Sequence, residues 1–122
     1  MSSLDTSRDN GQSPIDLVHL RAMTMSDPAL EREVLGLFVA QSGNIMAALT
    51  ALPRDTAALA HTLKGSARAI GAFGAADAAG RVEDAARSGS DIRTPAVRDA
   101  VAELSSEIDL ACAAIAKLLR KP

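Results

Sequence analysis

Hydrophobic residues recur every three or four positions along most of this chain, which is the period of a helix that buries one face. The most sustained series lies in the C-terminal quarter and consists of Val97, Val101, Leu104, Ile108, Ala111, Ile115 and Leu118. A second series consists of Leu30, Val34, Phe38, Ile45, Leu49 and Leu52. Each series predicts an amphipathic helix whose apolar side packs against other helices.

Proline and small polar residues between these series set the predicted helix boundaries. Ser13-Pro14 and Thr94-Pro95 each combine a capping residue with a first-turn proline. Gly71 suits a left-handed helix end, because glycine has no Cβ to clash there. The predicted helices cover about 15–23, from Pro28 to about 52, from the break at 53–55 to Gly71, about 73–87, and from Pro95 onward.

These elements predict an all-α protein. Four longer helices joined by short connections favour an antiparallel up-down-up-down four-helix bundle, to which the short extra N-terminal helix adds a lid. Residues 1–13 are polar and are expected to form a flexible tail. Residues 14–122 are then expected to form a single domain with one core, which suits a chain of 122 residues.

The composition supports this fold class and narrows the choice of partners. Hydrophobic residues make up 48% of the chain but aromatic residues only 2%, which suits closely packed helices better than a β-sandwich. The net charge of −2 gives no electrostatic reason to expect a nucleic acid partner. The chain also lacks the aromatic platforms on which single strands stack. We therefore expect no nucleic acid partner.

Cysteine and histidine usage bears on the compartment and on metal binding. Cys112 is the only cysteine, so no intrachain disulfide can form, as in a reducing cytosol. The polar N-terminus has no secretory signal, and no apolar run approaches the ~20 residues that span a bilayer. We therefore expect a cytoplasmic protein without a membrane partner. His19 and His61 lie on separate predicted helices without a Cys-His cluster, so no metal site is expected.

The helix predicted before Gly71 separates its polar residues from its apolar ones. At about 100° per residue, one narrow sector holds His61, Lys64, Gly65 and Arg68. Because the apolar stripe through Leu63 and Ile70 must face a core, the imidazole faces water beside two cations. A neutral imidazole has one ring nitrogen with a free lone pair, which suits nucleophilic attack on phosphorus.

The sequence around this histidine, AHTLKGS at residues 60–66 followed by IGA at 70–72, resembles the signature of histidine-containing phosphotransfer (HPt) domains of bacterial two-component relays. The positions at the family's spacing are His61, Lys64, Gly65, Ser66 and Gly71. The likeness extends more loosely through residues 38–41 and 81–87. The resemblance implies a carrier that accepts a phosphoryl group on Nε2 of His61 from a receiver-domain aspartate and passes it to another response regulator.

The resemblance also implies the partners, namely response-regulator receiver domains and a hybrid histidine kinase. The receiver would supply Mg²⁺, so this chain is expected to need no cofactor of its own. It has no nucleotide-binding motif and no room for a kinase domain, which predicts a carrier rather than an enzyme. We also expect the chain to be a monomer. Two alternatives stay open. One is a helical module that binds a receiver or another protein without being phosphorylated, and the other is a dimer through the last helix.

The neighbours of His61 each allow a functional and a structural interpretation. Lys64 and Arg68 would offset the charge of an incoming phosphoryl group, or they are ordinary solvated cations. Gly65 costs a helix about 1 kcal/mol relative to alanine. Its outward position indicates clearance for a partner, whereas packing against another backbone is the alternative.

Two residues outside this helix are candidate partner-facing or orienting residues. Gln41 lies in the upstream stretch to which the resemblance extends. Glu83 stands where chemotaxis kinases of the family have a glutamate that hydrogen-bonds the phosphorylatable histidine. A contact of Glu83 with Nδ1 of His61 would hold the proton on that nitrogen and leave Nε2 as the nucleophile. The alternative is an exposed ion pair between Glu83 and Arg87, four residues apart on one helix.

Overall fold

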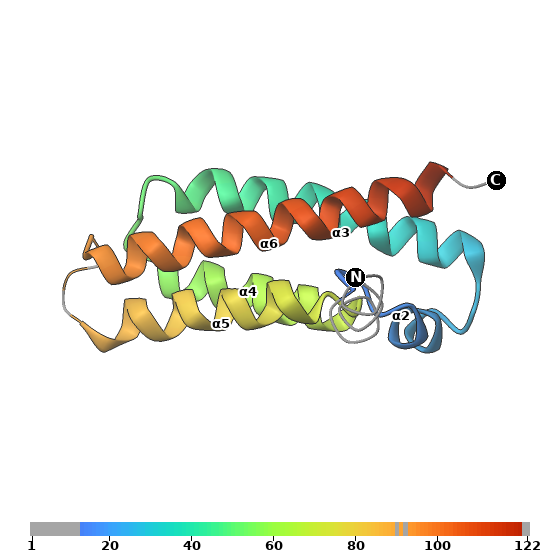
Figure 1. Ribbon diagram of the computed structural model, residues 1–122, viewed down its shortest axis with the longest axis horizontal. Helices are drawn as coiled ribbons and strands as arrows, with labels where there is room; N and C mark the ends of the chain where they lie inside the picture. The colour runs from blue at the N-terminus through green and yellow to red at the C-terminus, as the bar shows by residue number, and fades with distance from the viewer. Residues whose placement is uncertain (1–12, 90, 92, 121–122) are drawn as a thin grey trace, which may run out of the picture.

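The computed structural model describes residues 13–89, 91 and 93–120, so the tail expected at 1–13 lies outside the described residues except for Ser13. The described part contains five helices and no strand, which confirms the all-helical class. Figure 1 shows the four longer helices side by side along the longest axis, with the short one at one end. The helices are α2 (Leu17–Met23), α3 (Pro28–Leu49), α4 (Thr56–Ala69), α5 (Phe73–Ser88) and α6 (Pro95–Arg120).

Aspartate side chains cap the first two of these helices. Asp27 accepts hydrogen bonds from two backbone N–H groups in the first turn of α3, at 2.9 and 3.3 Å. Asp16 accepts one from the N–H of His19, at 3.1 Å. These caps satisfy N–H groups that have no partner within the helix. Because Asp16 is the cap, α2 begins at Leu17 rather than at residue 15.

The end of α3 differs from the prediction. The helix ends at Leu49, three residues before the end that the apolar pattern indicates. Leu52 has a left-handed backbone with a φ of 48°, which a continuing helix does not allow. Its side chain still packs against the core from the turn. The hydrophobic pattern therefore continues past the helix itself, and this part of the prediction was wrong.

Alanine makes up many of the buried residues of α4 and α5, which pack closely against each other. On α4, Ala60 and Ala67 are buried on either side of Leu63. On α5 the buried residues are Ala75, Ala76, Ala78, Ala79, Val82, Glu83 and Ala86. Alanine allows two helices to approach closely, since the distance between helix axes depends on the side chains at the contact. This close contact brings the outer edges of α4 and α5 within reach of each other's polar side chains.

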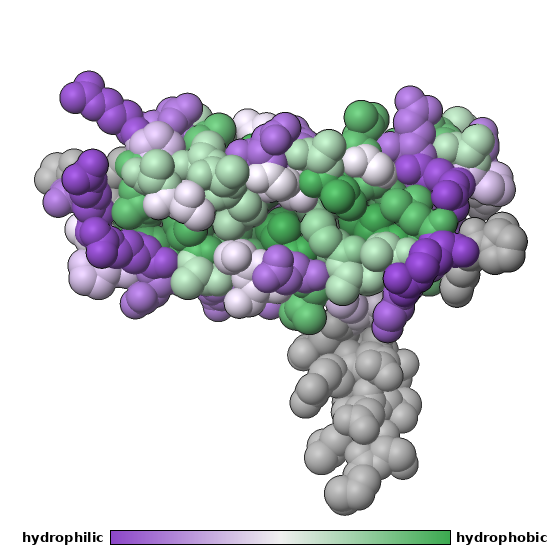
Figure 2. Space-filling model, turned by 90° about the horizontal axis from the view of Figure 1, so that it is seen from above, coloured by the Kyte–Doolittle hydropathy of each residue, from purple (hydrophilic) through white to green (hydrophobic). Residues whose placement is uncertain are grey.

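The apolar series of α6 is used inside the bundle. Its buried residues are Val97, Val101, Leu104, Ile108, Ala111 and Ile115. In Figure 2 the molecule is seen from above, which is the side where Figure 1 draws α3 and α6. On this face the hydrophobic residues lie mostly along the middle and the hydrophilic ones mostly along the edges. A dimer through this series would have to expose the core of the chain. None of the described helices is both long and apolar enough to span a bilayer.

Gly71 joins the turn between α4 and α5 to the start of α2. Its φ is +85°, the left-handed conformation that the sequence predicts there. Its carbonyl oxygen accepts a hydrogen bond from the N–H of Asp16 at 2.9 Å. A Cβ added to Gly71 would lie 2.7 Å from the carbonyl oxygen of Asp16. The position therefore needs glycine for its conformation and for the close approach of two backbones.

Replacing Gly71 with alanine is expected to lower the free energy of unfolding by about 1–2 kcal/mol or more, because it combines a left-handed backbone with a backbone clash. Urea unfolding followed by circular dichroism measures the change. Gly43→Ala is the matched control, since nothing lies within 4 Å of a Cβ at this position in α3. That variant is expected to gain up to about 1 kcal/mol. Equal stability of the two variants would contradict the role given to Gly71.

Candidate functional site

The polar sector of α4 faces outward, while Leu63 and Ala67 on its other side are buried. The His61 side chain is 63% exposed. Gly65, one turn further along, is exposed, and a Cβ there would meet nothing within 4 Å. The imidazole therefore stands on an open surface with clear space on its C-terminal side.

Lys64 is less exposed than its place in the sector suggests. Its side chain is only 26% exposed, because the aliphatic stem extends toward α5. The Cδ atom lies 3.5 Å from where a Cβ of Gly80 would be, which is ordinary van der Waals distance. The ammonium group therefore ends between the two helices rather than in free solution.

The carboxylate of Glu83 on α5 joins these two side chains of α4. Glu83 is 8% exposed, which places it among the few buried polar residues. Its Oε2 atom lies 3.0 Å from Nδ1 of His61, and its Oε1 atom accepts a hydrogen bond from Nζ of Lys64 at 2.8 Å. Each carboxylate oxygen thus has its own partner on α4.

Arg87 is a third partner of the same carboxylate. Its Nη2 atom lies 3.0 Å from Oε2 of Glu83, one helical turn away. The sequence offers the contact with His61 and the pair with Arg87 as alternatives, but the structure contains both at once. Arg87 was not among the candidate site residues. The signal that could have found it is its spacing of four from Glu83, which alone does not separate a site residue from a surface pair.

These contacts determine the charge of Glu83 and favour one tautomer of a neutral imidazole. The hydrogen bond from Lys64 lowers the pKa of Glu83 below its ordinary value of 4.5; burial opposes this, and the charges of Lys64 and His61 add to it. The carboxylate is therefore ionised at neutral pH and can only accept hydrogen bonds. A neutral imidazole in contact with it carries its proton on Nδ1, so Nε2 keeps the free lone pair.

The structure does not bring the other candidates into this cluster. Arg68 is exposed and makes no ion pair among the described residues. Gln41 lies in α3, is half-buried, and makes no hydrogen bond to the cluster within the same part of the chain. His19 is half-buried and packs edge-on against Phe73, with ring centroids 5.1 Å apart. His19 therefore packs against an aromatic side chain, as expected for a structural residue.

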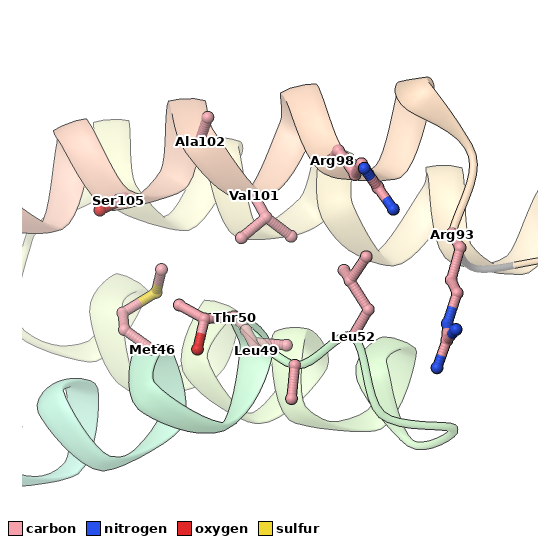
Figure 3. Close-up of a pocket in the computed structure, with 10 residues that line it drawn as sticks. Met46, Leu49, Thr50, Leu52, Arg93, Arg98, Val101, Ala102 and Ser105 are labelled. Atoms are coloured by element: carbon pink, nitrogen blue, oxygen red, sulfur yellow. The ribbon is translucent and has the colours of Figure 1, made fainter.

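A cavity of about 640 Å³ lies away from this cluster, between the end of α3 and the first half of α6 (Figure 3). Aliphatic residues such as Leu49, Leu52 and Val101 form much of its wall, and Arg93 and Arg98 also line it. The lining contains neither a histidine nor a carboxylate. This cavity is therefore separate from the cluster of His61, Lys64 and Glu83.

A helical bundle that presents an exposed histidine with one free ring nitrogen is suited to carrying a phosphoryl group. The comparison with protein families agrees, since the family model of the Hpt domain matches residues 33–117. The chain belongs to the Hpt domain family, whose members are phosphotransfer modules of two-component systems. The matched segment holds His61, Lys64, Glu83 and Arg87, whereas α2 precedes it. Neither the curated proteins nor the solved structures contain a match.

The ion pairs of Glu83 predict a pH-dependent contribution to stability. The pKa of Glu83 is lower in the folded chain than its ordinary value of 4.5, so folding favours the charged form. This contribution is fully present above pH 4.5 and is lost as the pH falls through the lowered pKa. Glu83→Gln removes it. The free energy of unfolding of the variant is expected to lie below that of the wild type at neutral pH.

Urea unfolding at about pH 7 and at about pH 3 tests this expectation, with Glu103→Gln as the control. Glu103 forms an exposed pair with Arg81 at 2.7 Å, away from His61. The difference in the free energy of unfolding between Glu83→Gln and the wild type is expected to be smaller at about pH 3 than at about pH 7. A difference that stays constant with pH would mean that the carboxylate charge does not stabilise the fold.

Proposed function

We propose that this chain is a phosphorelay carrier, in which His61 accepts a phosphoryl group from a receiver-domain aspartate and passes it to another response regulator. The contact between Nδ1 of His61 and the buried carboxylate of Glu83, at 3.0 Å, is the observation that carries the proposal. It leaves Nε2 as the free nucleophile on an imidazole that is 63% exposed. Membership of the Hpt domain family supports the same conclusion.

The transfer step balances without a further reactant. The lone pair of Nε2 forms a bond to phosphorus while the P–O bond of the aspartyl phosphate breaks, and that electron pair returns to the receiver carboxylate. The Nδ1 proton stays in place, so the product is an imidazolium whose charge Glu83 offsets. Transfer to the next aspartate is the reverse of this step. Since every bond change occurs between the two proteins, the chain acts as a carrier and needs no kinase activity.

The surrounding residues take supporting roles in this proposal. Lys64, fixed by its hydrogen bond to Glu83, contributes positive charge near the incoming phosphoryl group. Arg68 adds exposed charge along the same helix, and Gly65 leaves space for the receiver. Gln41 is assigned to the docking face. The receiver domain supplies the acidic pocket and Mg²⁺.

The architecture that fits this function is an antiparallel up-down-up-down bundle of α3 to α6 in one domain spanning residues 14–122. The alternating chain direction of successive long helices in Figure 1 supports it. The burial of the α6 series supports a monomer. In this proposal the carrier works in the cytoplasm, where a hybrid histidine kinase and response regulators are its partners.

Replacing His61 with glutamine is expected to abolish phosphoryl uptake while the helical spectrum and the melting temperature stay close to those of the wild type. The reason is that the side chain is mostly exposed. Labelled phosphorylated receivers incubated with each variant measure the uptake. Acid-labile, base-stable label on the wild type separates this function from that of a module that binds without being phosphorylated. Label on the His61→Gln variant would contradict the assignment.

Replacing Gly65 with glutamine is expected to slow transfer at least about tenfold, because a long side chain would occupy the approach to His61. A loss of about 1.4 kcal/mol in the free energy of docking corresponds to that factor. The stability is expected to stay level or to rise by up to about 1 kcal/mol. Gly36→Gln on α3 is the matched control, because a Cβ there also meets nothing within 4 Å. Equal transfer rates for both variants would remove the clearance role of Gly65.

A further inference from the structure

Arg87 shares a single carboxylate oxygen with the imidazole of His61. Both Nη2 of Arg87 and Nδ1 of His61 lie 3.0 Å from Oε2 of Glu83, whereas Lys64 binds the other oxygen. The guanidinium is thus the cation that competes most directly with the imidazole for Glu83.

The shared oxygen matters because Glu83 has two opposing effects on His61. The carboxylate fixes the proton on Nδ1, which leaves Nε2 free. A nearby negative charge also favours a second proton on the ring, and a doubly protonated imidazole has no lone pair with which to attack phosphorus. A positive charge on the same oxygen offsets the second effect and retains the first.

We infer that Arg87 is a positioning residue. Its positive charge weakens the tendency of the Glu83 carboxylate to favour a second proton on His61, so that the ring stays neutral with its proton on Nδ1 at physiological pH. The inference rests on the proposed function, because it concerns how the phosphoryl-accepting histidine is kept reactive. Arg87 acts through Glu83 and makes no direct contact with the transferred group.

Among the described residues, Arg87 is the charged group that pairs with the oxygen of Glu83 that contacts His61, Oε2. Lys64 and Arg68 come from α4 itself, and Lys64 occupies the far oxygen of Glu83. Glu83 and Arg87 come from α5. Among the described residues, α3 and α6 contribute no ion pair or hydrogen bond to the cluster. Removing Arg87 therefore leaves the imidazole of His61 as the remaining partner of Oε2 of Glu83.

The test uses the full chain and phosphoramidate, a small donor that needs no receiver. The Nε2–P bond forms as the P–N bond of the donor breaks, and ammonia leaves. Uptake is followed from about pH 6 to about pH 9 for the wild type, Arg87→Gln, Arg87→Lys and the control Arg81→Gln. Arg81 pairs with Glu103 on α6 and is 52% exposed, close to the 60% of Arg87.

Arg87→Gln is expected to lower uptake about two- to threefold near pH 6.5 and to match the wild type near pH 8.5, a modest effect because water screens the guanidinium, which is 60% exposed. Arg87→Lys keeps the charge and is expected to recover part of the loss, while Arg81→Gln is expected to follow the wild type. Imidazole ¹⁵N spectra at about pH 7 are expected to show more doubly protonated His61 in Arg87→Gln than in the wild type or in Arg81→Gln, with Arg87→Lys in between.

Three results would overturn the inference. Superimposable pH profiles for Arg87→Gln and the wild type would make Arg87 an ordinary surface pair. A loss of the same size at every pH would mean that Arg87 acts on the donor rather than on the ring. An unchanged ¹⁵N spectrum would show that the ring does not sense the guanidinium. If instead the wild type took label neither from phosphoramidate nor from a phosphorylated receiver, the proposed function would fail, and the spectra would still decide whether Arg87 controls the ring.

Discussion

The buried carboxylate of Glu83 is the constraint on which the arrangement of this site depends. A charge removed from water is costly unless it is paired and hydrogen-bonded. Glu83 meets this requirement with three partners, two from α4 and one from its own helix. The same contacts that satisfy the charge also orient an exposed imidazole. The pairing of the buried charge and the orientation of the imidazole therefore depend on one group of side chains.

The alanine-rich contact between α4 and α5 makes this pairing possible. Larger side chains in place of the buried alanines of these two helices, among them Ala60, Ala67 and Ala79, would disturb this close packing. The carboxylate would then lose its contacts with the α4 side chains and would have to be solvated instead. The packing of the core thus sets the geometry of the surface site, although no residue of the core takes part in the chemistry.

The site is also open, unlike an enzyme pocket. The imidazole of His61 is exposed, Gly65 adds no side chain beside it, and the cavity between α3 and α6 lies elsewhere. This arrangement suits the carrier that we propose, in which the phosphoryl group would arrive on another protein whose pocket closes over it. The chain then needs to provide only an oriented nucleophile and moderate positive charge, which a small helical bundle does without a cleft.

The sequence by itself determined the helices, the outward sector of α4 and the left-handed glycine at Gly71, because these depend on local periodicity and backbone sterics. The hydrophobic pattern overestimated the length of α3, because Leu52 lies in the turn after the helix and still packs against the core. Only the tertiary structure decided that Glu83 contacts His61, Lys64 and Arg87 together. Those contacts join side chains up to 22 positions apart on two helices, and their existence depends on interhelical distance and rotation, which no local pattern encodes.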